Sequence, residues 1–93
     1  MTEQNVQIRI EDAVLKGTYA NFMQVAHTKD EFVLDFGNLY PPQGIINARI
    51  ITSPGHFKRV VKAMQEALSK YEEEFGQVTE ANSPGPVGFA ERK

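Results

Sequence analysis

The stretch from Ser53 to Val78 constrains the fold of this chain more than any other. Ser53 can act as an N-cap, because its hydroxyl can accept from free backbone N–H groups of a first helical turn. Pro54 suits the first helical position, and Gly76 suits a left-handed C-cap. Apolar residues of this stretch recur at alternate steps of four and three, namely Phe57, Val61, Met64, Leu68, Tyr71, Phe75 and Val78, with Val60, Ala63 and Ala67 beside them. The stretch therefore predicts one long helix with a continuous apolar stripe.

The residues before this helix predict β-strands, because apolar and polar side chains alternate there. The expected strands are residues 6–11, 18–27, 31–37 and 45–52. Pro41 and Pro42 cannot donate to a strand ladder and place a loop over residues 38–44. We therefore expect an α+β fold, a four-stranded antiparallel meander followed by one long C-terminal helix (ββββα). In this fold the helix packs on the sheet, pairs with a partner helix, or does both.

The predicted helix should cover one face of the predicted sheet. That face comprises Val6, Ile8, Ile10, Phe32, Leu34, Phe36, Ile46, Ala48 and Ile50. The far face carries Val33, Ile45 and Ile51, and we place Met23 and Val25 of the second strand there too. Because neither side of this strand is clearly polar, the sequence leaves open which of its faces is buried. One helix about 10 Å wide cannot cover four strands. Surplus apolar surface on so small a domain predicts self-association.

With 93 residues the chain has room for one small domain. We assign residues 1–78 to a single ββββα domain. Residues 79–93 contain Asn82-Ser83-Pro84-Gly85-Pro86 and no periodicity, which predicts a flexible C-terminal tail. Val87 and Phe89 offer an alternative, a short docking motif, but the composition favours a disordered end.

Composition and motifs exclude several classes of function. The chain has no cysteine, so disulfides and thiolate metal sites are absent. Its apolar runs are too short for a membrane span and its start lacks a signal peptide, so we expect a cytoplasmic protein without membrane partners. His27 and His56 have no second ligand at metal spacing, and no phosphate loop or nucleophile elbow is present. We therefore expect no metal, no cofactor, no catalytic residue and no enzymatic activity.

Charged residues suggest two further local arrangements. Asp35 is either a buried acid with a shifted pKa or the partner of Arg49 or Lys29 in a cross-strand ion pair, and we prefer the ion pair. On the helix, bases precede acids, which is opposite to the order that the helix dipole favours. Three interpretations stay open: an anion at the helix start, antiparallel pairing with a second copy, or a solvated face without a role. The residues concerned are His56, Lys58, Arg59 and Lys62 in the first half and Glu72, Glu73 and Glu74 at the end.

Four segments resemble a known family. They are residues 19–21 (Tyr-Ala-Asn), 31–36, 53–59 and 71–76. Together they look like a small prokaryotic family called domain of unknown function 3467, over most of Thr18 to Gly76. That family has no established activity, so the resemblance implies no catalytic or ligand residue. The element order is also similar to the repeats of Pur-alpha, Whirly and the PC4 coactivator, which bind single-stranded nucleic acid, although no motif residues match.

Three functions of different classes follow. The preferred one is a non-enzymatic homo-oligomeric interaction module, a dimer or higher, with an interface at Phe57, Val61, Met64, Leu68, Tyr71 and Phe75. The alternative is a single-stranded nucleic-acid-binding module that uses the open sheet face, with contacts from Arg9, Tyr19, Arg49, Lys58, Arg59 and Lys62. A net charge of −2 makes any such binding weak and salt-dependent. The third, an enzyme or small-ligand binder with a pocket between sheet and helix, has only isolated polar residues in its favour.

Overall fold

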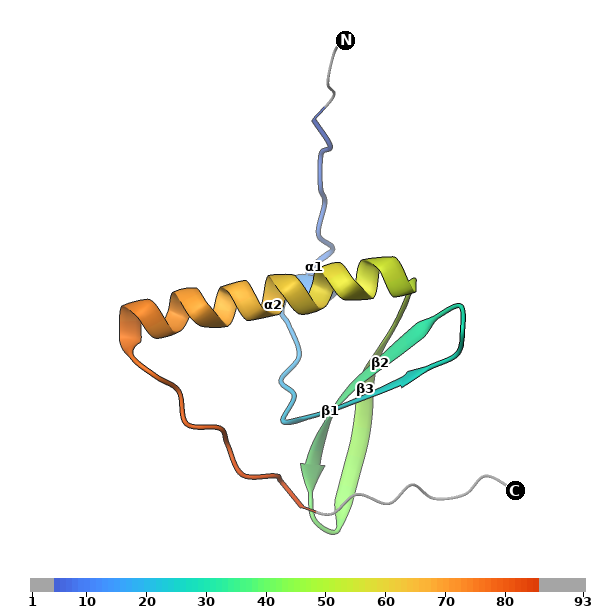
Figure 1. The fold of residues 1–93 in the computed structure, drawn as a ribbon. Helices are drawn as coiled ribbons and strands as arrows, with labels where there is room; N and C mark the ends of the chain where they lie inside the picture. The colour runs from blue at the N-terminus through green and yellow to red at the C-terminus, as the bar shows by residue number, and fades with distance from the viewer. Residues whose placement is uncertain (1–4, 86–93) are drawn as a thin grey trace, which may run out of the picture.

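A computed structural model describes residues 5–85 and shows a three-stranded antiparallel sheet and a long helix (Figure 1). The elements are α1 (Asp12–Leu15), β1 (Phe22–His27), β2 (Phe32–Tyr40), β3 (Gln43–Thr52) and α2 (Pro54–Phe75). The strands are hydrogen-bonded in the order β1-β2-β3. The α+β class and the C-terminal helix predicted from the sequence are therefore confirmed.

The sheet differs from the prediction at its start, because residues 6–11 form no strand and the described sheet has three strands instead of four. Val6, Ile8 and Ile10 are 84%, 89% and 57% exposed. Figure 1 shows this segment running away from the body, on the opposite side of α2 from the sheet. Alternating apolar and polar side chains are typical of a strand, but a strand forms only where a neighbouring strand accepts and donates its backbone hydrogen bonds. This segment has no such neighbour among residues 5–85.

The two prolines occupy a shorter connection than the sequence indicated. β2 continues to Tyr40 and β3 begins at Gln43, so the turn between them is Pro41–Pro42 alone. The predicted loop over residues 38–44 was therefore too long. Proline is tolerated at the end of a strand, where no ladder hydrogen bond from its nitrogen is required.

A β-bulge at Asn47 changes the faces of the neighbouring isoleucines. Phe36 pairs with Ala48, but the next residue, Gly37, pairs with Ile46, so Asn47 is the extra residue in β3. Ile45 consequently lies opposite Asn38. Because strand side chains alternate, this one-residue shift exchanges the faces that the sequence predicted for Ile45 and Ile46.

The register also settles the faces of β1. Met23 pairs with Phe36 and Val25 pairs with Leu34. Paired residues share a face, so Met23 and Val25 lie on the face of Leu34 and not on the far face, as the sequence analysis had placed them. The far face carries a polar row in which Gln24, Asp35 and Arg49 are directly opposite one another.

Helix α2 has the predicted caps. The backbone N–H of His56 donates to Ser53 Oγ at 3.2 Å, and Gly76 has a φ of 93°, which favours glycine. The helix meets the sheet near its start, where the rings of Phe57 and Phe32 stack with centroids 4.1 Å apart. None of the residues Pro54–Phe75 is buried. The helix is therefore well formed locally but anchored at one end.

The core within the single chain is small. Among residues 5–85, Leu34 is the only buried hydrophobic residue, at 6% exposed, and Asp35 is buried beside it at 3%. Both lie in the central strand β2, which neighbours cover on each side. The other apolar side chains of the described residues are at least partly exposed, so they are available to form a surface that binds a partner.

Candidate self-association surface

The apolar stripe of α2 is exposed over most of its length. Met64, Leu68 and Phe75 are 55%, 51% and 67% exposed, and Tyr71 packs its ring on Phe75 at 4.9 Å. Of the six predicted interface residues, Phe57 differs, because it stacks on Phe32 of the same chain. The other five present one apolar face of the helix that no helix or strand within residues 5–85 covers.

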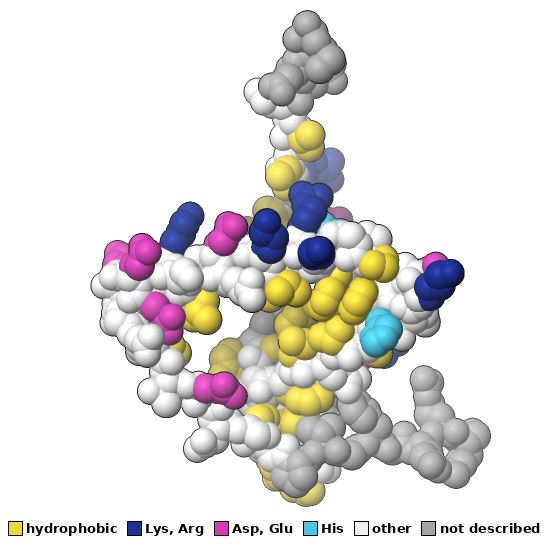
Figure 2. All heavy atoms as spheres, viewed as in Figure 1, with side chains coloured by type: hydrophobic (Ala, Val, Ile, Leu, Met, Phe, Trp, Pro, Cys, Tyr) yellow, Lys and Arg dark blue, Asp and Glu magenta, His cyan; other side chains and the backbone are white. Residues whose placement is uncertain are grey.

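The sheet adds to this exposed area. Met23, Val25 and Ile50 are each about half exposed and share the Leu34 face, on which Phe57 packs. Figure 2 shows hydrophobic side chains gathered between α2 and the sheet. We call this region the apolar surface; it comprises Met23, Val25, Ile50, Val61, Met64, Leu68, Tyr71 and Phe75.

The total accessible area of the chain is large for its mass. A compact protein of 10.4 kDa exposes about 5,400 Å², whereas this chain exposes 9000 Å². Part of this excess of about 3,600 Å² belongs to segments outside the helices and strands, such as residues 5–11 and 76–85, and not to the apolar surface. The single chain therefore exposes much more surface than a compact domain of its size.

The polar row on the far face is a structural ion pair. Arg49 donates from Nε to Asp35 Oδ1 at 2.7 Å and from Nη2 to Oδ2 at 3.0 Å, and Gln24 Nε2 donates to Oδ2 at 3.2 Å. The hydrogen bonds from Arg49, and secondarily from Gln24, lower the pKa of the Asp35 carboxyl. Asp35 in turn raises the pKa of Arg49. The predicted pairing of Asp35 with Arg49 is confirmed.

The residues predicted to contact nucleic acid lie on separate parts of the chain. Arg9 is in the exposed segment before α1, Tyr19 is in the connection to β1, and Arg49 is bound to Asp35 on the far face. Figure 2 shows basic side chains along the outer side of α2, the element that carries Lys58, Arg59 and Lys62. The structure groups these last three on one helix and does not bring the first three to them.

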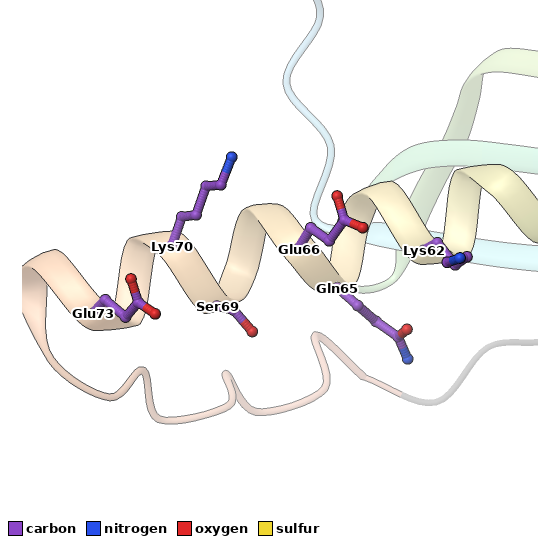
Figure 3. Close-up of a pocket in the computed structure, with 6 residues that line it drawn as sticks. All are labelled: Lys62, Gln65, Glu66, Ser69, Lys70 and Glu73. Carbon is purple, nitrogen blue, oxygen red and sulfur yellow. The ribbon is translucent and has the colours of Figure 1, made fainter.

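A shallow hollow of about 410 Å³ lies along the polar side of α2 (Figure 3). All its lining residues come from this one helix, namely Lys62, Gln65, Glu66, Ser69, Lys70 and Glu73. No buried polar group points into it from a second element. The hollow therefore lacks the convergent groups of a ligand or catalytic site.

Metal binding and membrane crossing also lack support within residues 5–85. His27 lies against Phe32 with ring centroids 5.4 Å apart, and His56 sits in the first turn of α2. No group of three histidine or acidic side chains in this range is arranged to hold a metal ion. None of the described helices has the length and apolar character to cross a membrane.

Comparison with known families gives a match. Residues 1–80 match the family described as "Protein of unknown function (DUF3467)". The chain belongs to this family. Comparison with curated proteins gave no match, and comparison with solved structures gave none. The DUF3467 family carries no functional description, so function has to be argued from the geometry above.

Two asparagines have a structural role that the sequence analysis missed. The side chain of Asn21 accepts from the backbone N–H of Leu39 at 2.9 Å and donates to its carbonyl at 3.1 Å. Asn38 Nδ2 donates to the Tyr19 carbonyl at 2.7 Å. Asn21 thus takes the place of a peptide group beside β2, which gives a physical role to the Tyr-Ala-Asn segment that resembles DUF3467. The sequence analysis placed Asn21 inside an expected strand over residues 18–27, whereas β1 begins at Phe22.

Proposed function

We propose that this DUF3467 protein is a non-enzymatic homo-oligomeric interaction module in which a second copy covers the apolar surface. The observation that carries the proposal is the contrast between one buried hydrophobic residue and an exposed apolar helix face. A small domain with so little core requires additional burial to be stable. Self-association supplies it without any other component.

The charges on α2 support an antiparallel arrangement of two helices. Lys58, Arg59 and Lys62 are in the first half of the helix, and Glu72 to Glu74 are at its end. In an antiparallel pair the basic half of one helix lies beside the acidic end of the other. Opposite charges at the rim of an interface favour the correct pairing, and salt weakens this contribution.

The direct test is the mass in solution, by light scattering coupled to size-exclusion chromatography at tens of micromolar. We expect a mass of at least two chains, and a monomer of 10.4 kDa would overturn the proposal. Leu68→Asp should dissociate the assembly, because burying an unpaired carboxylate costs several kcal/mol. Ser69→Asp is the matched control, since it adds the same charge at the next residue, on the polar side of α2 (Figure 3).

A second candidate function rests on the basic half of α2. Lys58, Arg59 and Lys62 are all exposed and form no ion pair with residues 5–85, which would suit contacts with a phosphate backbone. The candidate is weak single-stranded nucleic-acid binding. Fluorescence anisotropy with a labelled oligonucleotide at low salt tests it; binding that salt removes and that Arg59→Glu abolishes would support it. Absence of binding at tens of micromolar would leave the interaction module alone.

A further inference from the structure

Residues 5–11, here called the N-terminal arm, have the alternating side-chain pattern of a β-strand but pair with no neighbouring strand among the described residues. Val6, Ile8 and Ile10 alternate with Gln7 and Arg9, so one side of the extended arm is apolar and the other is polar. Val6 and Ile8, at 84% and 89%, are the most exposed large hydrophobic residues among the described ones, and Ile10 is 57% exposed. A half-buried strand is the structure in which this pattern is stabilised.

The sheet offers an open edge of matching length and pattern. β1 pairs with β2 on one side, and no described element pairs with its other side. Its six residues keep an unbroken register, with Met23 and Val25 on the apolar face and Gln24 on the polar face. β1 contains no proline, lysine or acidic residue, which are the groups that usually protect an open edge from further pairing.

We propose that the N-terminal arm of one copy adds as a fourth strand to the β1 edge of a second copy. Ile8 and Ile10 would then extend the apolar face beside Met23 and Val25. On the other face, Arg9 would lie at the end of the polar row, next to Gln24. This inference rests on the proposed self-association and specifies how two copies hold each other.

The geometry favours a second copy over the arm's own chain. Figure 1 shows the arm and the sheet on opposite sides of α2, so the arm is directed away from its own β1. If each copy gives its arm to the other, the exchange is reciprocal and closes as a two-fold dimer. The interface then needs no further subunit.

The charges and the register favour β1 over the edge of β3. The bulge at Asn47 interrupts the regular ladder of β3, and bulges commonly limit strand pairing. The polar residue in the regular part of β3 is Arg49, which would place a like charge beside Arg9. Gln24 on β1 is neutral and is hydrogen-bonded to the Asp35 carboxylate, so the β1 edge is the better neighbour for Arg9.

Cross-linking between engineered cysteines tests the arrangement, because the natural chain has no cysteine. Two full-length chains of different tag length, one with Ile8→Cys and one with Val25→Cys, are co-expressed and treated with a short bismaleimide. We expect a cross-linked product that contains both chains. The matched control replaces Val25→Cys by Ile50→Cys, which lies on the same face but in the opposite edge strand, and we expect little product from it.

The outcomes separate this inference from the proposed function. A dimer that gives no product with Val25→Cys, or that cross-links to Ile50→Cys instead, overturns the arm exchange and leaves self-association intact. A monomeric chain overturns the proposed function itself. As a second measurement, Ile8→Asp should raise the dimer dissociation constant by about tenfold or more, and Gln7→Asp, on the polar side of the arm, should raise it much less. Equal effects of the two variants would overturn the inference.

Discussion

The β2–β3 hairpin and helix α2 differ in where their side chains find partners. The hairpin contains Leu34 and Asp35, which are buried within the chain, whereas α2 has no buried residue. Strand pairing requires contacts between segments, so a formed hairpin already contains part of a core. A helix forms its backbone hydrogen bonds locally and takes most of its stability from packing of its apolar face. The hairpin therefore finds its packing partners within the chain, with β1 beside β2, whereas most of the apolar face of α2 stays exposed in the single chain.

The strongest test of this comparison replaces one leucine in each region. Leu34→Ala should lower the free energy of unfolding by about 2–5 kcal/mol, because it removes the buried side chain and leaves a cavity. Under the proposed self-association, Leu68→Ala should instead weaken the dimer, so the loss of stability should be greater at the lower protein concentration. Urea unfolding followed by circular dichroism at two protein concentrations distinguishes the two effects. A concentration-independent loss for Leu68→Ala would contradict the comparison.

A smaller loss is expected at the bulge of the hairpin. A Cβ atom on Gly37 would collide with the backbone carbonyl of Ile45, so Gly37→Ala should cost about 1–3 kcal/mol through forced backbone movement. Gly55→Ala is the matched control, because a Cβ there meets no atom within 4 Å. Thermal unfolding of both variants measures the difference. Equal melting temperatures would mean that the hairpin can relax around Gly37.

The ion pair of the hairpin should add a modest pH dependence. The folded pKa of Asp35 lies below the unfolded value of about 3.9, so its stabilising contribution is present above that pH and is lost as the pH falls toward the folded pKa. The Arg49 side chain is 62% exposed, and solvent screening keeps the effect small. Asp35→Asn should flatten the pH dependence of the urea midpoint between neutral and acid pH. The exposed Asp30→Asn is the control, and an identical profile for both variants would contradict this.

The smallest effect is expected at the C-terminal end. Residues 76–85 contain no helix or strand, and the flexible tail predicted for residues 79–93 continues past the described range, where Val87 and Phe89 also lie. Deleting residues 80–93 should change the free energy of unfolding by less than about 1 kcal/mol, because the described part of this segment, residues 80–85, contains no helix or strand. Unfolding of the truncated chain would show that this segment belongs to the domain.

Sequence patterns predicted the elements that depend on local interactions. Ser53, Pro54 and Gly76 correctly marked the ends of α2, since caps act within a single turn. Alternation located the central strand, and the pairing of Asp35 with Arg49 followed from their positions on neighbouring strands. These features can be read from the sequence because each is decided by a few neighbouring residues.

Features that depend on distant contacts were predicted less well. No local sequence signal indicated the bulge at Asn47, so Ile45 and Ile46 were assigned to the wrong faces of the sheet. Met23 and Val25 were misplaced because both faces of β1 look apolar and only the register with β2 decides between them. The N-terminal arm has a strand's pattern, but the pattern does not say which edge it pairs with. The predicted interface along α2 stays a prediction until the oligomeric state is measured.

The hydrogen bonds of Asn21 have a consequence for uncontrolled assembly. Its amide occupies the N–H and carbonyl of Leu39, which would otherwise be open to any passing strand. An unpaired strand edge can pair with strands of other chains and so start fibre formation. A side chain that hydrogen-bonds to the backbone of such an edge makes it unavailable for this pairing. By occupying β2 beyond the start of β1, Asn21 removes one stretch of open backbone on which a further strand could pair.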